Sequence, residues 1–290
     1  MRRGTAPAAL VLTAIVLTAC SSPSSTPSAA GPTRSASSTP SASSAAPTPT
    51  PAAPKALTAR LLPWRLPYAV GREAVFGLGR RAVVAGGLVA GDSSTDGVFT
   101  LDLETGSTRT AAPLAVPVHD TAGALAGGRL LVVGGGNATE QDVVQATSAG
   151  RHTWSVVGRL PQARSDLTAL RIGRRVVVLG GYDGTSVALP DLVATTDGAD
   201  WLQVGTLPVP VRYAAGVTLA GAGYLFGGER GGIMQRAVQR IDARGRASVV
   251  ARLPVPLGHA VAVRFGARIL VAGGRLTQTR LTDRMWWFDP

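Results

Sequence analysis

Short aliphatic runs recur along the chain, and each ends in a pair of glycines. Four to six apolar residues closed by Gly-Gly predict a buried strand that ends in a turn with positive φ, which glycine adopts at little cost. The first glycines of the five pairs are Gly86, Gly134, Gly180, Gly227 and Gly273, spaced 48, 46, 47 and 46 residues apart. The pattern therefore predicts a structural repeat of about 47 residues.

Each repeat holds three more strand-like segments. A strand of small residues precedes the aliphatic run, as in TAGALAG, and a third strand follows it, as in VFTLDL. A fourth strand then closes on Leu-Pro, at Pro161, Pro208 and Pro254. Four short strands in about 47 residues are typical of one propeller blade, so the chain is predicted to be all-β.

These repeats resemble the kelch family, in which an apolar strand ends in Gly-Gly and a Trp follows at a fixed spacing. Trp154 and Trp201 stand at the Trp position, while other copies carry Arg60, Ala247 or the segment TRT there. The resemblance covers about residues 57–290. It implies a kelch-like β-propeller, but a fold of this kind does not imply an activity.

The two ends of the repeat region predict how the ring closes. The C-terminal MWWFDP is a third strand without a fourth, and TARLLPWRLP, ending at Pro67, is a fourth strand without a third. Pairing of the N-terminal strand with the C-terminal strands would leave no free sheet edge. Five doublets then predict five four-stranded blades. The alternative is an additional degenerate blade, but no residues remain in the repeat region to form one.

The first 19 residues have the pattern of a signal peptide. Arg2 and Arg3 precede an apolar run from Ala8 to Leu17, which is too short for a stable membrane span. The tetrapeptide Leu-Thr-Ala-Cys that ends at Cys20 resembles the lipobox of bacterial lipoproteins, which implies a lipid on Cys20. We therefore expect an extracytoplasmic protein anchored to the membrane of a cell envelope. An ordinary secretory peptide followed by an unrelated Cys is the alternative.

Residues 21–55 consist of Ser, Thr, Pro, Ala and Gly, apart from Arg34 and Lys55. Such a segment has nothing to bury, so residues 20–55 are predicted to be a lipidated Cys with a disordered tether. The Pro content would extend this tether to roughly 100 Å. A linker without a required length fits equally well. The propeller is then predicted over residues 56–290.

Composition narrows the class of protein. A single Cys excludes a disulfide scaffold, and a hydrophobic content of 45% excludes a chain that is disordered throughout. Lys+Arg number 29 against 17 Asp+Glu, a formal net charge of +12. Nucleic-acid binding is not expected, because the basic residues show no interleaved aromatics. Six arginines at the first turn of the repeats either attract anionic lipid headgroups or are simply solvated: Arg80, Arg81, Arg129, Arg174, Arg175 and Arg268.

One position per repeat is predicted to form a polar ring at the central channel. It lies five residues beyond the strand-ending Pro, where the fourth-to-first and second-to-third connections share a face. These positions and their neighbours supply the candidate ligand-binding residues Arg72, His119, Asp120, Asp166, Arg212, Tyr213 and His259. Such a mixture can hold a sugar, a peptide or an anion through convergent hydrogen bonds. The alternative is a structural role, in which the same groups bind backbone and channel water.

The candidate residues favour binding over catalysis. The best-known secreted kelch-like enzymes resemble galactose oxidase, whose copper-radical site needs a Tyr cross-linked to a Cys and a pair of His ligands. The only Cys of this chain lies in the lipobox, so this chemistry is excluded. A sialidase-like site needs an Arg triad and a Tyr/Glu pair. Arg72, Arg164, Arg212 and Tyr213 are near the right face, but Glu73 is the only Glu counted there, and no paired carboxylates stand at a repeat-consistent spacing.

We therefore expect a non-catalytic module that binds an envelope protein or a glycan, without catalytic residues, cofactor or metal. A carbohydrate-active hydrolase or lyase that uses the polar ring is the alternative. A third possibility is a purely structural ring, with the partner docked on the blade edges.

Overall fold

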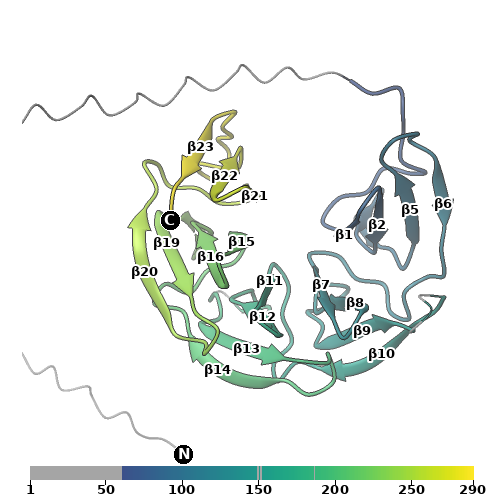
Figure 1. The fold of residues 1–290 in the computed structure, drawn as a ribbon, viewed down its shortest axis with the longest axis horizontal. Helices are drawn as coiled ribbons and strands as arrows, with labels where there is room; N and C mark the ends of the chain where they lie inside the picture. The colour runs from purple at the N-terminus through teal and green to yellow at the C-terminus, as the bar shows by residue number, and fades with distance from the viewer. Residues whose placement is uncertain (1–60, 149, 151, 186) are drawn as a thin grey trace, which may run out of the picture. The chain divides into compact units, whose positions relative to one another are not determined.

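The computed structural model describes residues 61–290, apart from 149, 151 and 186, as five antiparallel sheets arranged as a β-propeller (Figure 1). The predicted all-β fold with five blades is confirmed. The signal peptide, Cys20, the tether and residues 56–60 lie outside the described residues. The part of the chain that is described contains no helix long and apolar enough to cross a membrane.

The strands follow the predicted repeat, and in each sheet the first strand lies nearest the centre (Figure 1). The first sheet contains β1 (Ala74–Leu78), β2 (Arg81–Ala85), β5 (Val98–Asp102) and β6 (Thr108–Thr110). The second contains β7 (Ala122–Ala126), β8 (Arg129–Val133), β9 (Val143–Thr147) and β10 (Trp154–Arg159). The third contains β11 (Thr168–Ile172), β12 (Arg175–Leu179), β13 (Asp191–Thr195) and β14 (Leu202–Thr206).

The fourth sheet contains β15 (Ala215–Leu219), β16 (Ala222–Phe226), β19 (Ala237–Ile241) and β20 (Ala247–Arg252). Among the described residues, the fifth has three strands, β21 (Val261–Phe265), β22 (Arg268–Ala272) and β23 (Met285–Phe288). Two small hairpins extend from the connections between the second and third strands of their sheets. They are β3 (Leu88–Val89) with β4 (Ser93–Ser94), and β17 (Glu229–Arg230) with β18 (Ile233–Met234).

The hydrophobic core lies between consecutive sheets. Ala74 and Phe76 of β1 belong to one buried cluster with Leu130 and Val132 of the second sheet. The Phe76 ring fits there because the facing residue is Gly123, where an added Cβ would come within 3.0 Å of the ring. Small residues on the innermost strands therefore let neighbouring sheets approach each other closely.

Buried polar side chains fix the segments that cross from one blade to the next. Gln145 in β9 accepts a hydrogen bond from the Val116 N–H at 2.8 Å and donates to the Val116 carbonyl at 2.9 Å. Gln239 in β19 makes the same pair of bonds to Val209. Because these amides are fully buried, each bond that is lost would leave an unsatisfied group in the core.

The predicted closing strand is wrong for residues 61–67, which form no strand with the fifth sheet. Trp64 instead lies against Gly106, where an added Cβ would be 2.0 Å from the ring, and Tyr68 packs edge-on against Phe99 at 5.5 Å between ring centroids. Pro63 and Pro67 have no N–H to donate to a sheet. The segment therefore packs on the first sheet, and the described residues leave the outer edge of β23 unpaired.

The arc of sheets stays open between the fifth and the first (Figure 1). Val261, Val263 and Phe265 on β21 are 61%, 45% and 71% exposed, whereas Ala74 and Phe76, which occupy the positions of Val261 and Val263 on β1, are buried. The face of the fifth sheet that would meet a following blade is thus apolar and uncovered among the described residues.

The glycine doublets give a direct test of the packing. Gly227 has φ +60°, and a Cβ there would come within 2.0 Å of the Leu257 carbonyl oxygen; Gly221 has φ +75° and open space around it. We expect Gly221→Ala to cost about 1–2 kcal/mol of backbone strain. Gly227→Ala should lower the free energy of unfolding further, because the next crossing segment must move. Urea denaturation of both variants measures the difference, and equal losses would contradict the close approach.

Candidate functional site

The five predicted ring positions come together at one end of the central axis. All five residues are non-glycine and adopt the left-handed conformation, with φ between 48° and 60°. The N–H of each of the last four donates to the carbonyl of the preceding one, at 2.9 to 3.0 Å. The chain of bonds runs through Arg72, Asp120, Asp166, Tyr213 and His259. The strained backbone at these positions is therefore tied to contacts between blades, and it aims five side chains at one mouth.

The residue after each glycine doublet joins the same face. His119 pairs through its backbone with Gly136, Ser165 with Tyr182, and Arg212 with Glu229. These bridges connect the segment entering each blade to the loop between its second and third strands. The expected sharing of one face by these connections is therefore present in the structure.

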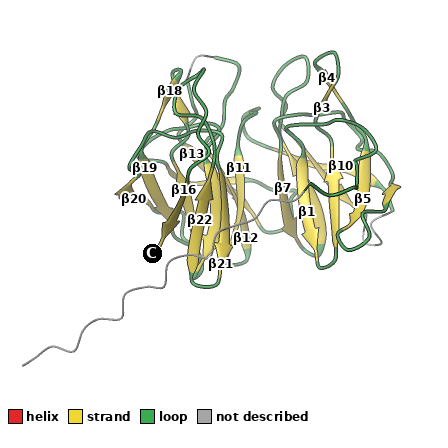
Figure 2. Ribbon diagram, turned by 90° about the horizontal axis from the view of Figure 1, so that it is seen from above, coloured by secondary structure: helices red, strands yellow, loops and turns green. Residues whose placement is uncertain are grey.

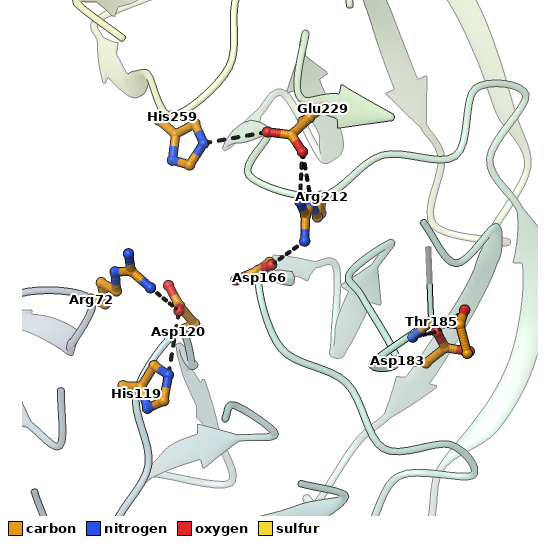
Figure 3. Close-up of polar contacts among 9 residues, drawn as sticks. All are labelled: Arg72, His119, Asp120, Asp166, Asp183, Thr185, Arg212, Glu229 and His259. Atoms are coloured by element: carbon orange, nitrogen blue, oxygen red, sulfur yellow. Dashed lines mark hydrogen bonds and ion pairs between the residues drawn. The ribbon is translucent and has the colours of Figure 1, made fainter. Parts of the chain in front are cut away.

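Arg72, Asp120 and His119 form the first polar cluster of the mouth (Figure 3). Arg72 donates to Asp120 Oδ2 at 2.8 Å, and His119 Nε2 lies 3.7 Å from the same oxygen. The other ring nitrogen of His119, Nδ1, is 2.8 Å from the Ser94 hydroxyl. Arg72 is half exposed, so this cluster keeps one charged donor open to solvent.

Arg212 organises the second cluster (Figure 3). Its Nη2 and Nε donate to Glu229 Oε1 at 2.6 and 3.1 Å, and its Nη1 lies 3.4 Å from Asp166 Oδ2. Its guanidinium lies over the Tyr182 ring at 4.6 Å. The Tyr213 and His259 rings stack at 3.8 Å between centroids. The planar groups of this cluster are therefore packed on one another in two pairs, one of a guanidinium on a ring and one of two rings.

The pKa values of the two buried carboxyl groups, Asp166 and Glu229, shift in opposite directions. Burial, reinforced by the neighbouring Asp120, raises the pKa of Asp166 to about 7. Burial alone would also raise the pKa of Glu229, but the hydrogen bonds from Arg212 hold it below its usual value. Burial, followed by the charge of Arg275, lowers the pKa of His259. Near neutral pH the mouth therefore holds an ionised Glu229 and an Asp166 that readily gains or loses a proton.

Two clefts meet at Arg212 and Tyr182. One has a volume of about 190 Å³ and is lined mainly by polar residues, among them Asp120, Asp166 and Asn137. The other, of about 410 Å³, is lined by Glu229 and by Gly231 and Gly232 of the β17–β18 hairpin. Within the described residues, no three His, Cys, Asp or Glu side chains are placed to hold a metal ion together.

Counting residues from the strand-ending prolines located the ring but did not identify all the acidic side chains at the mouth. Glu229 is 1% exposed and paired with Arg212, so Glu73 is not the only Glu at the mouth. Asp120 and Asp166 occupy equivalent positions in adjacent blades and interact, so the expected absence of paired carboxylates is wrong as well. The position directly after each glycine doublet was the sequence signal for Glu229 and Tyr182.

Arg164 does not join the mouth cluster. Its fully buried side chain donates to Asp191 Oδ2 at 2.6 Å and to the carbonyls of Gly180 and Gln162. These bonds hold the segment entering the third blade, as the buried glutamines do elsewhere. The sialidase-like arginine triad is therefore not assembled.

Comparison with known proteins supports the fold. No family model matches the chain, and no curated protein matches it in sequence, so the kelch resemblance stays a prediction. The solved structure of YjhT, itself a propeller, superposes with a TM-score of 0.66 at 11% identity, over 74% of this chain and 80% of that one. At this identity the likeness shows the architecture alone.

The raised pKa of Asp166 predicts a dependence of stability on pH. The native state holds a proton on Asp166 that the unfolded chain releases near pH 4. The contribution of this proton to the free energy of unfolding is therefore complete below pH 4 and is lost as pH rises through about 7. The stability of the wild type relative to Asp166→Asn should fall by up to about 1.4 kcal/mol per pH unit in that window.

Urea denaturation at pH 5, 6 and 7 measures this difference. Asp183→Asn is the control, because hydrogen bonds from Thr185 lower the pKa of the exposed Asp183, and its contribution is constant in this range. Parallel profiles for wild type and Asp166→Asn would show that the raised pKa is wrong.

Proposed function

We propose that this protein is a lipid-anchored, extracytoplasmic propeller that binds a polar envelope ligand, most simply a glycan, at the mouth without transforming it. The observation that carries the proposal is the ring of five left-handed residues, whose backbones are bonded from blade to blade. Because the fold fixes these positions, the side chains lose little freedom when a ligand binds, and preorganisation of this kind favours affinity.

The chemistry of the mouth suits a polyhydroxylated ligand. Arg72 offers an exposed charged donor, and Asp120 and Asp166 offer acceptors that a sugar hydroxyl can share. Tyr182 and Tyr213 supply ring faces on which the apolar face of a sugar can lie. The larger cleft, about 410 Å³, lies within the range of roughly 300–1,000 Å³ usual for small-ligand sites. An exposed segment of an envelope protein is the other ligand that these groups could bind.

The cellular location is proposed from the N-terminal sequence. The apolar run before Cys20 and the Ser/Thr/Pro/Ala segment after it support lipid attachment and a tether outside the cytoplasm. Mass spectrometry of the protein extracted from membranes tests this part. Loss of residues 1–19 together with a diacylglyceryl mass on Cys20 is expected, and a free thiol at that position would contradict it.

Binding at the mouth is tested by thermal shift against oligosaccharides of N-acetylated amino sugars, uronic acids and neutral hexoses. A ligand that binds only the folded state at 100 times its Kd should add about 2.7 kcal/mol of stability. Arg72→Gln and His259→Gln should each weaken binding about tenfold, since a charge-assisted hydrogen bond or a stacked ring is lost. Arg244→Gln, on a turn at the opposite end, is the control.

Two outcomes would refute this glycan site. One is a panel that gives no shift at any concentration. The other is a shift that both mouth variants leave unchanged, which would place the ligand elsewhere.

The carbohydrate-active hydrolase or lyase stays the second candidate, favoured by one observation. Asp166, with a pKa near 7 beside Asp120, is suited to donate and accept a proton at neutral pH. Oligosaccharides that bind should be incubated with the protein and their products separated. Turnover that Asp166→Asn abolishes while binding persists would favour the enzyme; intact oligosaccharides would favour the binding module.

A further inference from the structure

The end of the propeller opposite the mouth carries the hairpin turns of each sheet (Figure 2). These turns join the first strand to the second and the third to the fourth. We call this surface the basic end and define it by Arg174, Arg175, Arg244, Arg264 and Arg268, with Phe265 and Trp287. None of these residues belongs to the mouth clusters.

In the part of the chain that the structure describes, three arginines of the basic end form no ion pair with a carboxylate. Arg174 and Arg175 lie on the β11–β12 turn, and Arg244 on the β19–β20 turn. The two turns touch, since a Cβ on Gly173 would be 3.9 Å from the Ala243 Cβ. All three arginines are exposed, and within the described residues none forms an ion pair. They therefore place three positive charges on two adjacent turns.

Most carboxylates at this end are already neutralised by other arginines. Arg246 pairs with Asp242 at 2.8 Å and Arg268 with Asp289 at 2.7 Å. Arg80 lies 3.7 Å from Asp102 and 3.1 Å from Glu104. Asp197 and Asp200, on the β13–β14 turn, are in no ion pair within the described residues, so they offset part of the positive charge at this end.

An exposed aromatic pair stands at the same end. Phe265 at the end of β21 is 71% exposed and Trp287 is 37% exposed, with their rings 5.9 Å apart. The Arg268 guanidinium lies 4.6 Å from the centre of the Trp287 ring, and Arg264 directly precedes Phe265. Aromatic rings flanked by arginines are the side chains that enter the headgroup layer of a bilayer while their charges meet lipid phosphates.

We propose that the basic end docks on the surface of an anionic phospholipid membrane, with Phe265 in the headgroup layer and the three unpaired arginines on lipid phosphates. The proposal rests on the membrane-anchored location put forward above and adds an orientation to it, in which the mouth faces away from the membrane. The uncovered aromatic pair favours lipid over a soluble phosphate polymer, which would offer the rings no apolar layer.

The test uses residues 20–290 with Cys20→Ser, which retain every strand that the structure describes, so that neither the apolar N-terminal run nor an acyl chain contributes. Vesicles of phosphatidylcholine, with or without phosphatidylglycerol, are sedimented with the protein. Binding should require phosphatidylglycerol and weaken with salt. The triple variant Arg174→Gln/Arg175→Gln/Arg244→Gln should bind on the order of 100-fold more weakly, at about fivefold per charge. At high salt, where the electrostatic attraction is screened, Phe265→Ser should bind vesicles more weakly than the wild type.

The matched control removes three exposed arginines from loops on the mouth side, as Arg230→Gln/Arg280→Gln/Arg284→Gln, and should leave binding within a few-fold of wild type. Equal losses of vesicle affinity in the two triple variants would show that net charge alone drives binding, and would overturn the proposed orientation. Absence of binding to anionic vesicles would overturn the docking itself. Self-association without vesicles that Phe265→Ser abolishes would assign the exposed face to a second copy.

The outcome is independent of the ligand at the mouth. Arg72→Gln should bind vesicles as the wild type does, whatever it does to glycan binding. Loss of vesicle docking with glycan binding intact would refute only the membrane orientation, and the reverse result would refute only the glycan site.

Discussion

The backbone bonds between successive blades at the mouth are the constraint on which the rest of the structure depends. Two residues before each innermost strand lies a residue in the left-handed region, and in the second to fifth blades its N–H donates to the carbonyl of the equivalent residue of the preceding blade. The bond sets the distance between neighbouring sheets at the axis. It also forces the next connection past a glycine doublet, where a Cβ would strike a carbonyl oxygen. Strain, close packing and the polar ring thus share one cause.

The chain of backbone bonds ends at the first sheet and at the fifth, and these two sheets are covered differently. It begins at the Arg72 carbonyl and ends at the His259 N–H, and within the described residues no such bond joins the first sheet to the fifth. Trp64 and Tyr68 pack on the first sheet, while Val261 and Phe265 of the fifth stay uncovered. Among the described residues nothing covers this side of the fifth sheet, so its apolar face is exposed beside the arginines of the basic end.

The two ends of the propeller handle charge in different ways. At the mouth, Arg212 and Glu229 neutralise each other in a largely buried setting, so the site offers directed hydrogen bonds with little net field. At the basic end, arginines on solvated turns keep their charge and act over a distance that salt limits. The first arrangement suits selective recognition of a small ligand, and the second suits attraction to an extended anionic surface.

The sequence by itself determined the repeat, the all-β class, the five blades and the ring from Arg72 to His259. These follow from local rules: apolar runs make buried strands, Gly-Gly permits positive φ, and a fixed spacing repeats a position in every blade. Only the tertiary structure decided that Glu229 forms an ion pair with Arg212 and that Asp120 raises the pKa of Asp166. It also decided that Trp64 packs against Gly106 instead of joining the predicted closing strand. Each of these depends on distances between residues far apart in the chain, and spacing along the chain does not contain such distances.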